Sequence, residues 1–264
     1  MKRSINWKAV FVALLATFAC VMLIQAVGLF VDDWTGFRQS TNATTPFNEE
    51  DMGGYIRQPW NTVSSLGYVF VGVYILCLPC ENRNRKSLRM DESFPVVLLF
   101  AIATVVTGVG STFFHMSLTF VGQTCDVVGM YLLSVFLILY AFRNQPKMTS
   151  TLFYVSYTLS NLILLVILIF LPELRRYLFA GMIVVGLLLE YFFNRKLQFK
   201  YILIATNSLL LGYIIWQLDN MKIFFPKTGP LQGHAIWHLL GAVSCWFLYR
   251  HYIFECETQP QSQE

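Results

Sequence analysis

Long apolar stretches alternate with short polar ones along the whole chain. Eight windows are long enough to cross a bilayer as helices, since about 20 residues span roughly 30 Å of hydrocarbon. They cover residues 9–31, 61–80, 95–114, 118–142, 150–171, 177–193, 201–219 and 231–253. Unbroken apolar runs such as "LILLVILIFL" favour helices, because barrel strands alternate lipid-facing and lumen-facing residues. The pattern predicts an all-α, polytopic transmembrane helix bundle with eight spans.

Composition agrees with a membrane protein. Hydrophobic residues make up 56% of the chain and charged residues 13%, whereas a soluble domain has about 25% charged residues. Placing the N-terminus in the cytoplasm puts thirteen of the 19 Lys and Arg residues on the inner side and six on the outer side. The net charge of +4 is therefore explained by basic residues that set the topology. We expect the lipid bilayer as partner, with no nucleic acid and no protein partner.

The charge count also predicts where the loops lie. Both termini are expected in the cytoplasm, with the 32–60 and 220–230 loops facing the periplasm of a bacterium or the lumen of the ER or Golgi. The first window follows the basic segment "MKRSINWK" and could be a signal peptide. Because its apolar stretch is long and lacks a clear small-x-small cleavage site, we favour a retained helix.

Other polar motifs have ordinary structural explanations. Cys77 and Cys80 form a "CLPC" motif without a second cysteine pair, which indicates helix-end packing. The sequon at residues 42–44 matters only in a secretory pathway. Glu190 and His251 lie near inner helix ends, where their polar tips can reach the interface, so we expect structural roles.

Three of the four histidines fall near the outer boundary. His234 and His238 begin the eighth window four residues apart, which places both on one face of a helix. His115 ends the third window, which runs in the opposite direction, so the topology brings all three to the same surface. Three protein nitrogens with one open position are typical of a catalytic zinc ion.

Two more polar residues share this level of the membrane. Ser111 lies one turn before His115 on the same helix face, although its hydroxyl could simply bond to its own helix backbone. Asp126 enters the fourth window from the outside and is the only acid deep in that window. Burying an ionisable group in a membrane is costly, so such a residue is a site candidate by default.

The segments "PWNTVSSLG", "GVGSTFFHMSLTFVGQTCD" and "GHAIWHLL" resemble, in order, three blocks of the alkaline ceramidases. That family belongs to a superfamily of seven-helix membrane hydrolases with Per1-like proteins and adiponectin-type receptors. The resemblance implies a zinc-dependent amidase that cleaves ceramide to a sphingoid base and a fatty acid. It also implies that His115, His234 and His238 are zinc ligands and that Ser111 and Asp126 complete the site.

The resemblance covers residues 55–255 and implies a division of the chain. Residues 1–54 would form an extra N-terminal transmembrane helix and an outer loop, and residues 55–255 a seven-helix membrane domain. Residues 256–264, "ETQPQSQE" with one preceding residue, are polar and expected to be a disordered tail.

Calcium binding is not expected. Calcium-dependent relatives carry a segment resembling "DWCE" and a glutamate before the "WNT" block, whereas this chain has "DWTG" at residues 33–36 and Gln58 followed by Pro59. Losing carboxylate ligands weakens a calcium site. Acids that could substitute are Asp32, Asp33, Glu49, Glu50 and Asp51.

In the implied chemistry, zinc activates a water molecule, Asp126 moves its proton, and Ser111 helps zinc to stabilise the oxyanion. Two alternatives stay open. The first is a lipid-ester hydrolase of the same superfamily, such as a Per1-like phospholipase. The second is a receptor or metal transporter that uses the same histidines without turnover.

Overall fold

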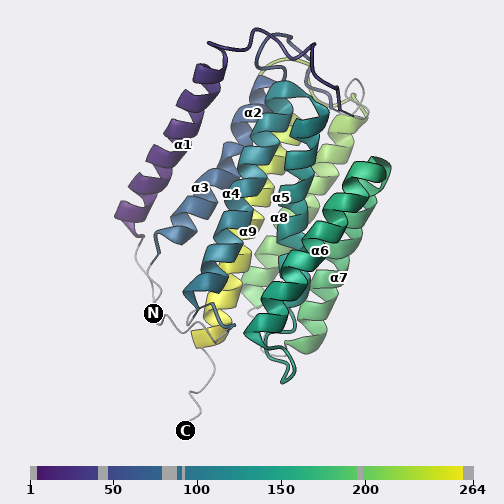
Figure 1. Cartoon of the computed structure of the whole chain (residues 1–264). Helices are drawn as coiled ribbons and strands as arrows, with labels where there is room; N and C mark the ends of the chain where they lie inside the picture. The colour runs from purple at the N-terminus through teal and green to yellow at the C-terminus, as the bar shows by residue number, and fades with distance from the viewer. Residues whose placement is uncertain (1–4, 41–46, 79–87, 91–92, 195–198, 258–264) are drawn as a thin grey trace.

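Helices account for most of the chain in the computed structural model, which describes residues 5–40, 47–78, 88–90, 93–194 and 199–257 (Figure 1). The helices are α1 (Trp7–Val27), α2 (Pro59–Ser64), α3 (Leu66–Leu76), α4 (Phe94–Ser117), α5 (Phe120–Tyr140), α6 (Ser150–Phe170), the 3-10 turn η1 (Pro172–Leu174), α7 (Arg175–Phe193), α8 (Phe199–Asn220) and α9 (Gly233–Glu257). Within the described ranges, the only extended pairing is an isolated bridge between Gln39 and Thr119. The predicted all-α bundle is confirmed.

Within the described part of the chain, six helical segments have the length and hydropathy to cross a membrane: α1, α4, α5, α6, η1 with α7, and α8. The other two predicted windows contain helices that are not single apolar spans of this kind. The window at 61–80 is divided at Ser65 into the short helices α2 and α3. The last window, α9, carries His234, His238 and Arg250, which lower its mean hydropathy.

The helices run alternately up and down in Figure 1. The start of α1 and the end of α9 lie at the lower end of the bundle, whereas the end of α1 and the start of α9 lie at the upper end. The predicted even number of passes therefore agrees with the arrangement. The domain boundaries at residues 54 and 255 stay a prediction.

Three features considered in the sequence lie outside the described residues. They are the sequon at residues 42–44, Cys80 and the end of the tail. Cys77 is described and carries a free thiol.

Side-chain caps explain where several helices begin. The side chain of Asn6 accepts a hydrogen bond from the backbone N–H of Ala9 at 3.1 Å. Thr119 and Thr149 act in the same way at the starts of α5 and α6, where they accept from backbone N–H groups at 3.1 and 3.2 Å. Each cap satisfies an N–H that the helix itself leaves unpaired.

The connection between α4 and α5 is unusually tight. Leu118 adopts φ 50°, a left-handed conformation that ends α4, and Thr119 immediately caps α5. The two helices therefore form an antiparallel hairpin at the upper end of the bundle. This turn fixes the height of His115 relative to Asp126 across the hairpin.

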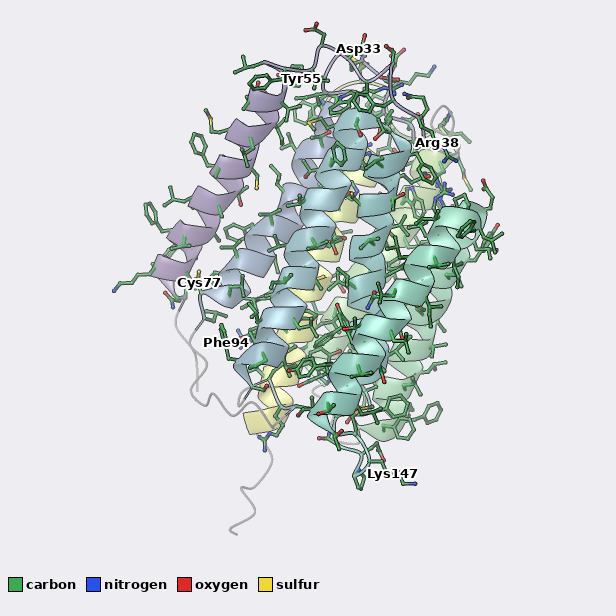
Figure 2. The ribbon with its side chains drawn as sticks, viewed as in Figure 1. Asp33, Arg38, Tyr55, Cys77, Phe94 and Lys147 are labelled. Carbon is green, nitrogen blue, oxygen red and sulfur yellow. The ribbon has the colours of Figure 1, made fainter. Side chains whose placement is uncertain are left out.

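Helices α4 and α5 form the centre of the bundle, with α3, α6 and α7 packed around them. A Cβ built on Gly110 would lie 2.4 Å from the backbone oxygen of Cys125, and one on Gly129 would lie 2.4 Å from the Cα of Thr107. Small residues at these points let the two backbones approach closely, as is common between helices in membranes. The large exposed side chains of α1, α6, α7 and α8 are mostly apolar and project outward, which suits contact with lipid (Figure 2).

A buried ionic cluster closes the lower end. Arg143 donates to both carboxylate oxygens of Glu190 at 2.7 and 2.9 Å, and His251 Nε2 lies 3.0 Å from one of them. These three side chains are at most 1% exposed. The structural roles expected for Glu190 and His251 agree with this arrangement, but their tips do not reach the interface. They pair with Arg143 instead, because a charge buried in a bundle needs a partner.

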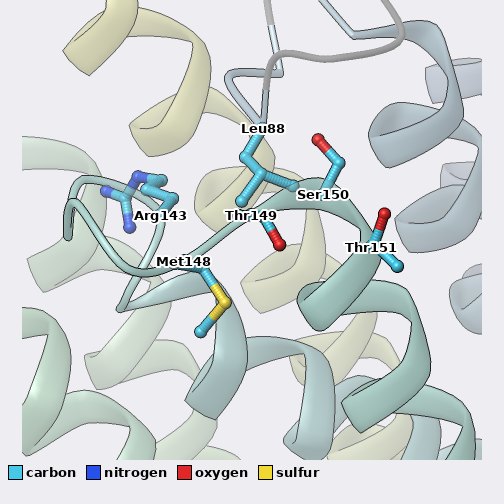
Figure 3. Close-up of a pocket in the computed structure, with 6 residues that line it drawn as sticks. All are labelled: Leu88, Arg143, Met148, Thr149, Ser150 and Thr151. Carbon is cyan, nitrogen blue, oxygen red and sulfur yellow. The ribbon is translucent and has the colours of Figure 1, made fainter.

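One cavity, of about 440 Å³, lies beside this cluster at the lower end (Figure 3). It is lined by Leu88, Arg143, Met148, Thr149, Ser150 and Thr151. It lies at the end of α5 and the start of α6, far along the bundle from the predicted site residues.

The contact at Gly110 gives a prediction for stability. Gly110→Ala places a methyl group against the backbone of α5, so we expect the midpoint of thermal unfolding in detergent micelles to fall by about 2 to 6 °C. Gly181→Ala in α7 is the matched control, since nothing lies within 4 Å of its Cβ position. Alanine is the better helix former, so the control should be neutral or stabilising. Equal midpoints for the two variants would contradict the close approach of α4 and α5.

Candidate metal centre and active site

The three histidines singled out in the sequence lie together at the upper end of the bundle. His115 is on the last turn of α4, and His234 and His238 are on the first two turns of α9. They are 0%, 6% and 3% exposed, and their candidate ligand atoms all lie within 4.8 Å of one another. Nε2 of His234 is 3.2 Å from Nε2 of His115. Two antiparallel helices thus bring three imidazoles to one point.

Aromatic side chains cover the histidine cluster. The ring of Phe47 packs on His115 and His234 at centroid distances of 4.9 and 4.3 Å. Trp216, from α8, lies 5.7 Å from the His234 ring and stacks on Trp237. The cluster is therefore buried among apolar groups, where an isolated imidazolium would be costly. Neutral imidazole, the form that binds a metal, is favoured there.

Two of the histidines have their second ring nitrogen held by an oxygen atom. Nδ1 of His115 lies 2.7 Å from Oε1 of Gln58. Nδ1 of His238 lies 2.9 Å from the hydroxyl of Ser64 and 3.2 Å from that of Ser65. Nδ1 of His234 is buried and has no hydrogen-bond partner among the described residues.

This donor set fits a metal ion. Metal-binding histidines usually donate their other ring N–H to an oxygen atom, which fixes the ring and its tautomer. His115 and His238 are oriented in this way, and their Nε2 atoms face the cluster. The described residues contain this one group of three or more possible metal ligands.

Ser111 and Asp126 join the cluster from α4 and α5. The Ser111 hydroxyl lies 3.3 Å from Nε2 of His238, accepts a hydrogen bond from Ser65 at 3.1 Å, and also bonds to the Asp126 side chain. The Ser111 hydroxyl therefore contacts side chains from outside its own helix. Asp126 is half-buried, so all five predicted residues meet in one place.

Sequence reasoning missed several residues that position the site. Ser64 and Ser65 were quoted only as letters of a motif, and Gln58 only as a departure from it. A helix broken at Ser65 could not be foreseen from an apolar run, yet that break turns both hydroxyls toward His238. Pro59, a frequent first residue of helices, was the one signal that a helix begins just after Gln58.

Two acids cap the helices that carry these groups. Glu49 accepts from the backbone N–H groups of Trp60 and Asn61 at 2.7 and 2.9 Å at the start of α2. Burial raises the pKa of Glu49, and these two hydrogen bonds oppose the effect. Asp219 accepts from the backbone N–H of Gly233 at 2.9 Å, at the start of α9. Neither acid was assigned this role from the sequence, because each contacts a helix start 11 or 14 residues further on and does not occupy the N-cap position itself.

Three of the five acids considered as substitute calcium ligands, Asp33, Glu49 and Asp51, have hydrogen-bond partners within the protein. Asp33 accepts two hydrogen bonds from Thr35, which lower its pKa. Asp51 forms a bidentate ion pair with Arg57 and accepts from the backbone N–H of Gly53 at 3.0 Å. Burial opposes ionisation of Asp51, but the hydrogen bonds and charge of Arg57 outweigh it, so the pKa of Asp51 is lowered.

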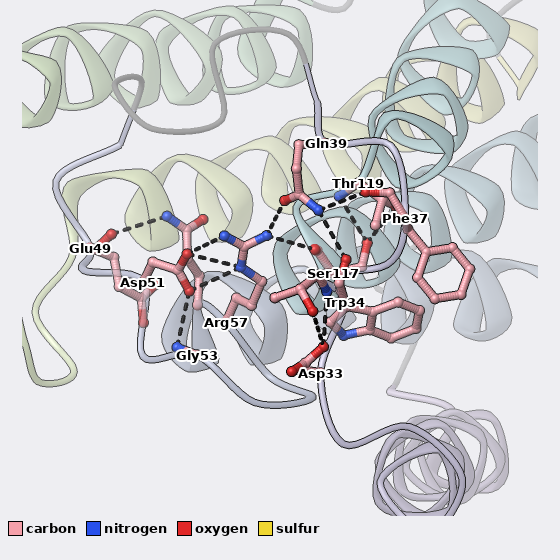
Figure 4. A network of polar contacts seen from close by, with 12 residues as sticks. Asp33, Trp34, Phe37, Gln39, Glu49, Asp51, Gly53, Arg57, Ser117 and Thr119 are labelled. Atoms are coloured by element: carbon pink, nitrogen blue, oxygen red, sulfur yellow. Dashed lines mark hydrogen bonds and ion pairs between the residues drawn. The ribbon is translucent and has the colours of Figure 1, made fainter.

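Arg57 occupies the centre of this acidic loop (Figure 4). Its guanidinium also donates to Oε1 of Gln39 and, at 3.3 Å, to the backbone oxygen of Ser117 at the end of α4. A fixed cation therefore already lies among the oxygen atoms of this loop. The Asp51 carboxylate is therefore already paired with a cation, whereas a calcium site needs six to eight oxygen ligands.

Comparison with known proteins points to one family. A family profile described as Ceramidase matches residues 41–264. The chain is 24% identical over 247 residues to alkaline ceramidase 3 of Mus musculus, an alignment that covers 86% of this chain and 88% of the relative. It is also 24% identical over 229 residues to the protein dcd3A of Dictyostelium discoideum, whose name assigns it to the alkaline ceramidases, with 73% and 78% of the two chains covered.

Proposed function

Because the chain belongs to the ceramidase family, we propose that it is a zinc-dependent membrane amidohydrolase that cleaves ceramide, or a closely related lipid amide, to a sphingoid base and a fatty acid. The observation that carries this proposal is the convergence of three buried imidazoles beside a linked serine and aspartate. The histidine set resembles catalytic zinc sites with three protein nitrogens and an open position. When bound there, zinc supplies Lewis acidity and a water molecule of lowered pKa.

Asp126 is the proposed general base and acid. It takes a proton from the water that attacks the amide carbonyl carbon, and it returns a proton to the nitrogen as the C–N bond breaks. The products are then an amine and a fatty acid, and the Asp126 side chain returns to its initial protonation state. The Ser111 hydroxyl bonds to the Asp126 side chain, which holds this carboxyl group beside the histidines.

Ser111 has a second proposed role. Its hydroxyl is 3.3 Å from Nε2 of His238, so it lies where the carbonyl oxygen of a bound amide would develop negative charge. Once Asp126 has taken the proton of the water it can donate to Ser111, so the single Ser111 hydrogen becomes available to stabilise that charge in a site from which water is excluded. The Phe47 and Trp216 rings supply such an apolar surrounding.

A lipid amide suits the place of the site in the bundle. The histidines lie near one end of helices whose outer surfaces are apolar, so the amide of a lipid at the interface would meet them while its chains stay in hydrocarbon. We propose that this end faces the periplasm or the ER or Golgi lumen, with both termini cytoplasmic, because the excess of Lys and Arg lies toward the opposite end.

The catalytic assignments predict two distinct failures. His238→Ala should lose both bound zinc and hydrolysis, whereas Asp126→Asn should keep zinc and lose hydrolysis by at least about a hundredfold. Metal analysis and fatty-acid release from matched amide and ester lipids measure these effects. Asp32→Asn, at an exposed position of the upper loop, is the control. Full activity in either site variant would refute its role, and faster cleavage of the ester would point to the lipid-ester alternative.

The position of Arg57 predicts independence from calcium. A zinc chelator such as 1,10-phenanthroline should abolish fatty-acid release, and stoichiometric zinc should restore it. With zinc supplied in excess of EGTA, removing or adding calcium should leave the rate unchanged, because Asp51, Asp33 and Glu49 are already paired with Arg57, Thr35 and backbone N–H groups. A rate that falls in EGTA and recovers only with calcium would show that these acids hold the ion after all.

The topology gives a separate prediction. A cysteine introduced at Lys227 should react with a membrane-impermeant maleimide from the periplasmic or lumenal side, and one at Lys147, at the lower end of the bundle, only after the membrane is opened. Native cysteines are replaced by serine or alanine in the parent protein. The reverse labelling pattern would place the site on the cytoplasmic side.

A further inference from the structure

Gln58 is the residue in closest polar contact with His115. Its side chain is 3% exposed, and it immediately precedes α2 at the upper end of the bundle. Oε1 lies 2.7 Å from Nδ1 of His115, and Nε2 lies 3.0 Å from the backbone oxygen of Glu49. The same residue also bonds His115 through the backbone, since its N–H donates to the His115 carbonyl oxygen at 3.0 Å.

The neighbours of Gln58 fix which way its amide points. The backbone oxygen of Glu49 can only accept a hydrogen bond, so the amide nitrogen must face it. The amide oxygen is then left facing His115, with the side-chain nitrogen of Asn61 at 3.5 Å from that same oxygen. An amide oxygen is also only an acceptor, and therefore Nδ1 of His115 must carry the hydrogen.

The hydrogen on Nδ1 also determines the state of the other ring nitrogen, Nε2. A neutral imidazole with hydrogen on Nδ1 has its free lone pair on Nε2, and Nε2 of His115 is the atom 3.2 Å from Nε2 of His234. The lone pair is thus directed into the histidine cluster. Without an acceptor at Nδ1, the hydrogen could move to Nε2 and block the ligand atom.

We propose that Gln58 is a positioning residue that selects the Nδ1–H tautomer of His115 and so presents Nε2 to the metal ion. This inference rests on the proposed function, in which His115 is a metal ligand. Glu49 acts one step further out, because its backbone oxygen orients the Gln58 amide while its carboxylate caps α2. The first turn of α2 and the ring of His115 are therefore set by one chain of hydrogen bonds.

The test compares metal affinity in Gln58→Leu and Gln58→Glu. Leucine removes the acceptor at similar size, so zinc affinity, measured by competition with a chromogenic chelator, should fall about tenfold to a hundredfold. Glutamate keeps an oxygen acceptor and should retain most of the affinity. The visible absorption spectrum of the cobalt-substituted protein should change in the leucine variant and resemble wild type in the glutamate variant, because it reports the geometry of the ligands.

Gln39→Leu is the matched control, since Gln39 belongs to the same loop network but contacts no histidine. A leucine variant at position 58 that binds zinc as tightly as wild type, with an unchanged cobalt spectrum, would overturn the inference while leaving the proposed function intact. So would equal losses in the leucine and glutamate variants. Wild-type protein that holds no stoichiometric metal would instead overturn the proposed function, and this inference with it.

Discussion

At the upper end of this protein, buried polar groups need hydrogen-bond partners, because leaving one unpaired in an apolar bundle is costly. Every group of the site that the structure buries is held by another: His115 by Gln58, His238 by two serines, Ser111 by Ser65 and Asp126. Such networks are stable only when nearly all members are satisfied. Among the described residues, Nδ1 of His234 has no such partner, and that ring packs against Phe47 and Trp216 instead. Most of the ring orientations are therefore set by the protein's own contacts.

The sequence was sufficient for the architecture and for the meeting of the three histidines. Apolar windows set the number and direction of the helices, and direction alone placed His115 level with His234 and His238. It was not sufficient for the network around them. Gln58, Glu49 and Asp219 contact groups 57, 11 and 14 residues further along the chain, and such contacts leave no periodic signal. The break at Ser65 was hidden because it lies inside a single predicted window, residues 61–80.

The two ends of the bundle use buried charge differently. At the lower end Arg143, Glu190 and His251 link the segment after α5 to α7 and α9. At the upper end no ion pair to a carboxylate is found for the three histidines within the described residues, and their Nε2 atoms face one another or Ser111. The same residue type, histidine, is thus structural at one end of α9 and a candidate ligand at the other.

That shared helix has a mechanical consequence. From His234 to His251, α9 runs about 26 Å at about 1.5 Å per residue, and it is anchored near both extremities, by the Asp219 cap above and by Glu190 below. These contacts oppose sliding or rotation of α9 relative to α8 above and α7 below. A long-chain molecule that enters between helices would therefore separate other pairs more easily than it would displace α9 from these two neighbours.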